Sequence, residues 1–200
     1  MIDRVELERN YWDEAALDPE VDIKYISDIS TEEMLMAIDD GGDSDFYKGT
    51  LAKGIALDIG CGVGRIADSL HAVGIDISEK MLEIARSRQS QSWPEKYHLC
   101  DGRTIPFEND IFDTAYSVLL FQHLEADTIQ NYIKETFRVL KPGGVFRFQF
   151  VEGDSHEGEF AHDYSYIQMS DWLREAGFIV DKVDRGLCHF QWTWVTARKP

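Results

Sequence analysis

Residues 55–64 read Ile-Ala-Leu-Asp-Ile-Gly-Cys-Gly-Val-Gly, an apolar run that continues directly into glycines at positions 60, 62 and 64. Glycine carries no Cβ, so the backbone there can turn sharply and approach a ligand closely. The following residues are expected to form a helix, whose first amides have no partner within the helix. The stretch therefore predicts a strand, a ligand-binding turn and a helix. The alternative is a tight turn that binds nothing.

Two further predicted strands end in acidic residues. A strand at 73–77 contains Asp76, and a strand at 96–100 is followed by Asp101 and Gly102. Ligands of open α/β sheets bind at the carboxyl ends of the strands, so both carboxylates are expected to face the glycine turn. Carboxylates suit a ligand rich in hydroxyl and amino groups, such as a nucleoside. We therefore expect an adenosine-containing cofactor.

Strands and helices alternate from residue 53 onward. Strands are predicted at 54–59, 73–77, 96–100, 111–117, 144–151, 178–184 and 190–198, and helices at 64–71, 79–89, 126–139 and 168–176. Ser78 and Ser170 are expected to cap two of these helices. Short links between alternating elements predict a parallel sheet covered on both faces. The last two strands follow one another without a helix, so one end strand is expected to run antiparallel.

Residues 1–50 differ from the rest of the chain, because they are acidic and aromatic and contain no strand-like run. Helices are predicted there at 5–16 and 31–38. We expect a single domain over residues 1–200, in which residues 1–50 form a helical cap or lid. Residues 51–200 then form the cofactor-binding core.

The chain has 37 acidic and 20 basic side chains among 200 residues, a formal net charge of −17. Nucleic acids and anionic membranes bind clustered Lys and Arg, whereas the basic residues here are scattered. We expect a small-molecule substrate, no nucleic-acid or membrane partner, and a monomer or homodimer. No apolar run reaches the roughly 18 residues that cross a bilayer, and the first residues are charged. A cytoplasmic location is therefore expected.

The cysteines Cys61, Cys100 and Cys188 are widely spaced and form no Cys-x-x-Cys pair. This spacing argues against a disulfide framework and against a zinc site of the usual kind. The stretch 156–163 contains His, Asp and Glu, which are metal-ligand types, but an acidic solvated loop is the simpler interpretation. No metal is therefore expected.

Six blocks of sequence, in order, carry a family resemblance over residues 54–198. The chain resembles the class I S-adenosylmethionine-dependent methyltransferases of the small-molecule type, such as those of ubiquinone and menaquinone biosynthesis. The resemblance implies a doubly wound, mostly parallel seven-stranded sheet, a Rossmann-like methyltransferase fold with its last strand antiparallel. The blocks are Leu57-Asp58-Ile59-Gly60-Cys61-Gly62-Val63-Gly64, Gly74-Ile75-Asp76-Ile77-Ser78 with Met81-Leu82, Asp101-Gly102 with Ile105-Pro106-Phe107, Phe112-Asp113 through Ser117 to His123-Leu124, Val139-Leu140-Lys141-Pro142-Gly143-Gly144, and Glu175-Ala176-Gly177-Phe178.

The resemblance implies that S-adenosylmethionine binds and that S-adenosylhomocysteine is released. The glycines would let the loop pass under the methionine part of the cofactor. Asp58 would position the amino group, with Ser117 nearby, and Tyr11 would reach the carboxylate or sulfonium region. The alternative for Tyr11 is that it only packs the first helix onto the domain. The residues implied at this end are Tyr11, Asp58, Gly60, Cys61, Gly62, Gly64 and Ser117.

The adenosine end is implied in the same way. Asp76 would accept hydrogen bonds from the ribose hydroxyls, while Ile77 and Met81 would pack against the adenine ring. Asp101 would accept from the exocyclic amine, and the Gly102 amide would reach a ring nitrogen.

One departure from the family concerns the first crossover. Only sixteen positions separate Gly60 from Asp76, about five fewer than in the family, so the first helix must be short. A shift of the second strand would endanger the contact of Asp76 with the ribose. A nicotinamide dehydrogenase is the rival interpretation, but Arg65 stands where its Gly-x-Gly-x-x-Gly motif needs glycine.

The reaction implied is methyl transfer to an oxygen, nitrogen or carbon atom of a small molecule. His123 is a candidate general base, although a histidine that only shapes the site is the favoured interpretation, because methyl transfer often needs no base. Val118-Leu119-Leu120-Phe121 replaces the polar-Pro-Pro-aromatic tetrad of the DNA and protein-glutamine methyltransferases and suits a hydrophobic acceptor. The alternative function is a non-catalytic module that binds S-adenosylmethionine without turnover.

Overall fold

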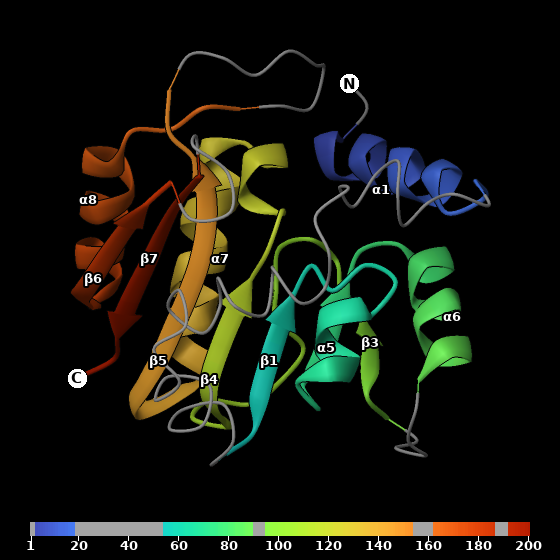
Figure 1. The fold of residues 1–200 in the computed structure, drawn as a ribbon, viewed down its shortest axis with the longest axis horizontal. Helices are drawn as coiled ribbons and strands as arrows, with labels where there is room; N and C mark the ends of the chain where they lie inside the picture. Colours follow the sequence, from blue (N-terminus) through green and yellow to red (C-terminus); the bar gives the residue numbers. More distant parts are fainter. Residues whose placement is uncertain (1–2, 19–53, 90–94, 154–161, 187–191) are drawn as a thin grey trace.

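A seven-stranded sheet forms the centre of the computed structural model, which describes residues 3–18, 54–89, 95–153, 162–186 and 192–200 (Figure 1). The strand order is β3-β2-β1-β4-β5-β7-β6. The strands are β1 Ala56–Ile59, β2 Val73–Asp76, β3 Tyr97–Leu99, β4 Phe112–Ser117, β5 Leu140–Val151, β6 Ile179–Arg185 and β7 Trp192–Arg198.

Strands β1 to β5 run parallel, and β7 lies antiparallel between β5 and β6. The predicted fold class is confirmed, and the last strand of the chain is antiparallel as expected. The edge of the sheet on that side is β6, however. The link between the two strands indicates their antiparallel pairing but does not say which of them meets β5.

Helices cover both faces of the sheet. Alternate residues of a strand point to opposite faces, so Leu57 and Ile59 join the core beneath α7 and α8, whereas Ala56 joins the core beneath α5 and α6. The helices of the described residues are α1 Arg4–Ala15, α5 Arg65–Ser69, α6 Glu79–Arg88, α7 Ala126–Val139 and α8 Tyr166–Ala176, and a 3-10 turn, η2, lies at Phe121–His123.

Two helix caps were predicted, and one of them is wrong. The Ser78 Oγ accepts a hydrogen bond from the Met81 amide at 3.1 Å and caps α6, as expected. Helix α8 begins at Tyr166, and Ser165 caps it by accepting from the Gln168 amide at 3.2 Å. Ser170 therefore lies inside the helix, because the buried Met169 extends its apolar face toward the N-terminus.

The short first crossover does not displace the second strand. Helix α5 has only five residues, yet Ile59 of β1 pairs with Ile75 of β2. The amides of Gly60 and Cys61 both donate to the Ile75 carbonyl oxygen at 2.9 Å. Asp76 is therefore level with the glycine turn, and the predicted danger to its position does not arise.

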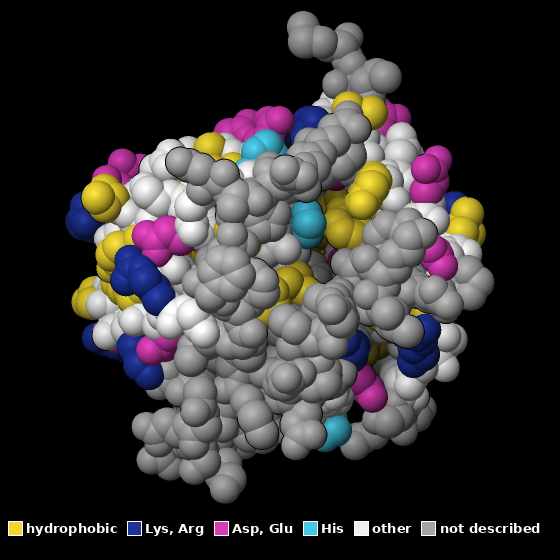
Figure 2. Space-filling view, turned by 45° about the horizontal axis from the view of Figure 1, so that its top comes forward, with side chains coloured by type: hydrophobic (Ala, Val, Ile, Leu, Met, Phe, Trp, Pro, Cys, Tyr) yellow, Lys and Arg dark blue, Asp and Glu magenta, His cyan; other side chains and the backbone are white. Residues whose placement is uncertain are grey.

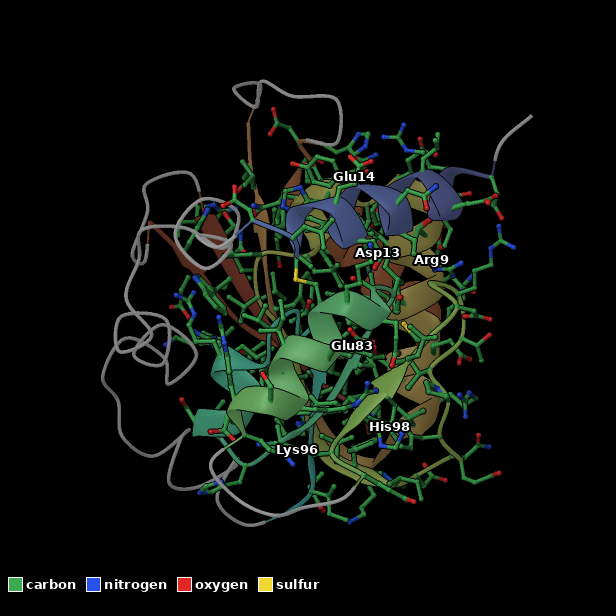
Figure 3. All side chains as sticks on the ribbon, turned by 90° about the vertical axis from the view of Figure 1, so that its right-hand side faces the viewer. Arg9, Asp13, Glu14, Glu83, Lys96 and His98 are labelled. Carbon is green, nitrogen blue, oxygen red and sulfur yellow. The ribbon has the colours of Figure 1, made fainter. Side chains whose placement is uncertain are left out.

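Helix α1 lies across the carboxyl ends of the strands, above α6 (Figure 1). Arg9 Nε donates to the Ile77 carbonyl at 3.2 Å, and Ser78 Oγ donates to Asp13 Oδ1 at 2.6 Å. Figure 3 shows Arg9 and Asp13 on the side of α1 that faces α6, and Glu14 on the opposite side.

The predicted helix at 5–16 is thus present at Arg4–Ala15, whereas the one predicted at 31–38 lies outside the described residues. None of the helices in the described ranges has the length and apolar character needed to cross a membrane.

Candidate active site

A cavity opens at the carboxyl ends of β1, β2 and β4, beneath α1. Its empty space is about 1000 Å³, including the part open to solvent. Figure 2 looks toward this end of the sheet and shows hydrophobic side chains gathered near the centre of the face. Eight sequence-predicted residues line the cavity: Asp58, Gly60, Cys61, Gly62, Asp76, Ile77, Met81 and Gly102.

The glycine turn serves two different purposes. Gly62 has a φ of +50°, and a Cβ there would meet no atom within 4 Å, so its backbone faces the open cavity. Gly64 has a φ of +77°, but a Cβ there would lie 2.5 Å from Tyr97 Oη and 2.9 Å from Ala85 Cβ. Glycine at 64 is therefore required by the packing of β3 and α6 against the turn, and Gly64 does not line the cavity.

Asp76 ends β2 and connects the glycine turn to α6. Its Oδ2 accepts from the Gly62 amide at 2.8 Å, and its Oδ1 accepts from the Ser78 amide at 2.9 Å. Burial raises the pKa of Asp76, although the two amide hydrogen bonds oppose that shift. The carboxylate is therefore held rigidly at the cavity wall and has lone pairs left for a ligand.

Asp58, near the end of β1, is only 3% exposed and also lines the cavity. Burial and, to a smaller extent, the nearby Asp76 carboxylate raise the pKa of Asp58 to about 8. Two carboxyl groups in one poorly hydrated space disfavour each other's ionisation. A ligand that brings a positive charge to this end of the cavity would relieve that repulsion.

The side of the cavity beyond β2 is apolar. Ile77, Met81 and Cys100 line it, and Cys100 Sγ lies 3.6 Å from Tyr132 Oη. A Cβ on Gly102 would lie 2.6 Å from Val5 Cγ1, so α1 rests directly on this glycine. A flat aromatic group would find apolar contacts here.

Asp101 does not line the cavity. Its Oδ1 accepts from the amides of Arg103 and Thr104 at 2.8 and 2.6 Å. Burial tends to raise the pKa of Asp101, but these hydrogen bonds outweigh it and lower the pKa below its usual value. The side chain thus holds its own loop, which a strand-end position alone does not indicate.

Three other expected residues also lie away from the cavity lining. Ser117 is buried and donates to the Ile59 carbonyl at 2.9 Å. The His123 ring lies beside Trp12, with ring centroids 5.3 Å apart. Tyr11 is 38% exposed, whereas Glu8 and Trp12 line the cavity in its place. Residues four apart share a helix face, so Glu8 and Trp12 of α1 both line the cavity. Tyr11 does not line it.

The sequence analysis missed a group of lining residues from α1, α5 and the segment after β4. Arg65 is the cation that α5 contributes to the cavity wall. The signal that could have found Glu8 and Trp12 is their i, i+4 spacing in a helix expected to cover the site. The missed residues are Glu8, Trp12, Val63, Arg65, Ile66, Leu124 and Tyr132.

Within the described ranges, no three His, Cys, Asp or Glu side chains come close enough together to hold a metal ion. Residues 156–161 of the acidic stretch lie outside those ranges.

Gln149 of β5 holds the segment that follows β4. Leu119 has a φ of +61°, an unfavourable value for leucine. Its amide donates to Gln149 Oε1 at 2.8 Å, and Gln149 Nε2 donates to Gln122 Oε1 at 2.7 Å. The fully buried Gln149 side chain therefore stabilises the strained backbone that forms one wall of the cavity.

Replacing Gln149 by methionine keeps the length of the side chain but removes both hydrogen bonds. We expect the free energy of unfolding to fall by about 2 kcal/mol, because the Leu119 amide loses its buried partner. Urea unfolding with an unchanged slope would measure this loss. The exposed Gln168→Met on α8 is the control, with an expected change within about 0.5 kcal/mol. An equal effect of both variants would contradict the role of Gln149.

Residues 57–148 match the family model described as a methyltransferase domain, which covers β1 through most of β5. Residues 57–148 therefore carry a methyltransferase domain. Among its relatives, a putative methyltransferase of Bacillus subtilis is 32% identical over 156 residues, covering 70% of this chain and 61% of the relative. The demethylmenaquinone methyltransferase of Leptospira interrogans is 39% identical over 101 residues, covering 45% of this chain and 40% of the relative.

The chain thus spans about two fifths to three fifths of the length of these curated relatives. A solved structure of magnesium protoporphyrin IX methyltransferase from Synechocystis PCC 6803, with S-adenosylmethionine bound, superimposes with a TM-score of 0.75. The two chains are 17% identical, and the match covers 100% of this chain and 99% of the other. The shared architecture confirms the fold.

Proposed function

We propose that this methyltransferase transfers a methyl group from S-adenosylmethionine to an oxygen, nitrogen or carbon atom of a small molecule and releases S-adenosylhomocysteine. The observation that carries the proposal is the juxtaposition of Asp76, Asp58 and the open backbone at Gly62 in one cavity at the carboxyl ends of the strands. Ligands of open α/β sheets bind at this place.

The residues present fit this cofactor. The rigid Asp76 carboxylate would accept from the ribose hydroxyls, and Ile77 and Met81 would pack against the adenine ring. The open space at Gly62 would admit the methionine part without meeting a side chain. The raised pKa of Asp58 means that the charge of its ionised form is poorly compensated. The methionine amino group, as an ammonium beside it, would supply that compensation. Arg65 would bind the methionine carboxylate.

The bound cofactor supplies a methyl group that is already activated by its sulfonium charge. The protein therefore contributes mainly alignment and a water-poor site. Leu119, Leu120 and Trp12 would exclude water from the reacting end of the cavity. We assign His123, whose ring lies against Trp12, to shaping this end.

Two observations support a small-molecule acceptor. The net charge of −17 disfavours polyanions, and the segment after β4 contributes the apolar side chains Val118, Leu119 and Leu120 to the cavity. An apolar cavity with a few convergent polar groups is typical of small-molecule sites.

Isothermal titration with S-adenosylmethionine and S-adenosylhomocysteine tests the proposal. Both are expected to bind, and binding near pH 7 is expected to release a proton. In the free protein Asp58 is protonated below about pH 8, whereas a neighbouring ammonium group of the ligand favours its ionised form. Affinity is therefore expected to rise with pH up to about 8. The heat of binding should differ between buffers of different ionisation enthalpy, and Asp58→Asn should remove that difference.

Formation of S-adenosylhomocysteine over a panel of metabolites and RNAs tests turnover. Turnover of a small molecule is the expected result. Turnover of RNA alone would overturn the acceptor class. Binding without any turnover would favour the non-catalytic module, and no binding of either cofactor form would overturn the proposal as a whole.

A further inference from the structure

One buried carboxylate in the cavity has no part in the proposed binding of the cofactor. Glu8 of α1 is 4% exposed and lines the cavity wall. Its ion-pair partner is Arg4, with Nε 3.6 Å from Glu8 Oε1. Burying an ionised carboxylate costs folding free energy. A buried carboxylate that lines a cavity is therefore a candidate for binding a ligand of opposite charge.

The charges around Glu8 are predominantly negative. Arg4 is shared with Glu125, which lies 3.5 Å from the same Nε at the start of α7. Asp127 of α7 adds a further negative charge, and the Tyr164 hydroxyl donates to the Leu124 carbonyl at 2.7 Å. Burial raises the pKa of Glu8 to about 7, Arg4 opposes the shift, and Glu125 and Asp127 increase it. One guanidinium thus stands among three carboxyl groups.

This negative region belongs to a different part of the cavity from the Asp58 and Asp76 pair. The carboxylates that raise the pKa of Glu8, Glu125 and Asp127, lie at the start of α7, whereas the carboxylate that raises the pKa of Asp58 is Asp76 at the end of β2. The apolar Trp12 and Leu124 line the cavity on the Glu8 side. A second ligand bound there would meet an apolar surface with one carboxylate set in it.

We propose that the methyl acceptor is a cationic amine carried on an apolar group, and that Glu8 binds its ammonium and accepts its proton. This inference rests on the proposed methyl transfer and specifies its substrate class. Neutral and anionic acceptors fit less well, because neither compensates the negative charge around Glu8.

The transfer needs the proton to leave first. An ammonium nitrogen has no lone pair, so one N–H bond breaks and its proton passes to a Glu8 carboxylate oxygen. The nitrogen lone pair then forms the bond to the methyl carbon while the carbon–sulfur bond breaks and leaves its electron pair on sulfur. The product is a methylated ammonium, and Glu8 returns its proton to solvent. A carboxyl group that titrates near neutral pH suits this exchange.

Three indole compounds with different charges provide the test. Tryptamine is cationic, tryptophol is neutral and indole-3-acetate is anionic, while the ring is the same. They are titrated at pH 8 into protein saturated with S-adenosylhomocysteine, so that the Asp58 end is already filled. We expect tryptamine to bind at least about tenfold more tightly than tryptophol, and indole-3-acetate to bind most weakly.

The Glu8→Gln variant should lose the preference for tryptamine and keep the affinities for tryptophol and S-adenosylhomocysteine within about twofold. Glu14→Gln is the matched control, because Glu14 is an exposed residue of α1 that does not line the cavity. The inference is overturned if tryptamine binds no better than tryptophol, or if its preference survives in Glu8→Gln. Failure of S-adenosylhomocysteine to bind would instead overturn the proposed function itself.

Thermal unfolding gives a second readout that needs no ligand. The folded-state pKa of Glu8 lies above its unfolded value, so its charge destabilises the fold above about pH 7 and has no effect below about pH 4. Glu8→Gln is therefore expected to raise Tm by about 5 °C or more at pH 8 and to leave it unchanged at pH 4. A lower Tm at pH 8 would mean that the carboxylate is a structural partner of Arg4, and would overturn the inference.

Discussion

Asp76→Ala is expected to weaken the binding of S-adenosylhomocysteine by about 100-fold or more. The proposed hydrogen bonds from ribose hydroxyls to a carboxylate are charge-assisted, and their loss corresponds to about 3 kcal/mol. The variant also deprives the Gly62 and Ser78 amides of their acceptor, which loosens the turn that faces the ligand. Isothermal titration measures the dissociation constant, and circular dichroism checks that the variant is folded.

Asp101→Ala is the matched comparison, because Asp101 also follows a strand that leads to this end of the sheet. Its carboxylate accepts from the amides of Arg103 and Thr104 and does not line the cavity. We expect its affinity for S-adenosylhomocysteine to change by less than about threefold. Comparable losses for both variants would contradict the distinction between the two carboxylates, and an unchanged affinity in Asp76→Ala would show that the ribose binds elsewhere.

Gly64→Ala is expected to destabilise the protein by about 3 kcal/mol, since the new Cβ combines an unfavourable positive φ with overpacking. The Cβ would lie 2.5 Å from Tyr97 Oη and 2.9 Å from Ala85 Cβ, so β3 or α6 must move. Chemical unfolding measures the effect on the free energy of unfolding.

Gly62→Ala, two residues earlier in the same turn, should behave differently. Its φ is also positive, but the new Cβ would meet no protein atom within 4 Å. We expect a destabilisation of only about 1 kcal/mol together with a large loss of affinity for S-adenosylhomocysteine, because the methyl group occupies space left for the ligand. Equal destabilisation by the two variants would contradict the division of the turn into a packing part and a binding part.

The acidic groups of the cavity illustrate how a site can oppose stability. Asp58 and Glu8 both have pKa values raised by burial, to about 8 and about 7. Each is easier to bury in its neutral form, so keeping it ionised near neutral pH costs folding free energy. Such groups are typical of functional sites, where a ligand of opposite charge completes the arrangement.

Most of the fold could be predicted because its signals are local. The apolar run of β1, the glycines that follow it and the cap at Ser78 depend on residues close together in the chain. The start of α8 was misplaced because Ser165 and Ser170 are equally good caps by type. Only the packing of Met169 decides between them.

The sequence by itself determined the order of strands and helices along the chain and the end of the sheet where a cofactor is expected to bind. Each of these follows from short-range spacing of apolar, glycine and acidic residues. Only the tertiary structure decided that Glu8 and Trp12 face the cavity instead of Tyr11, that Asp101 turns toward its own loop, and that Gly64 is needed beneath Tyr97. These outcomes depend on how segments far apart in the chain pack against one another, and no local pattern encodes that contact.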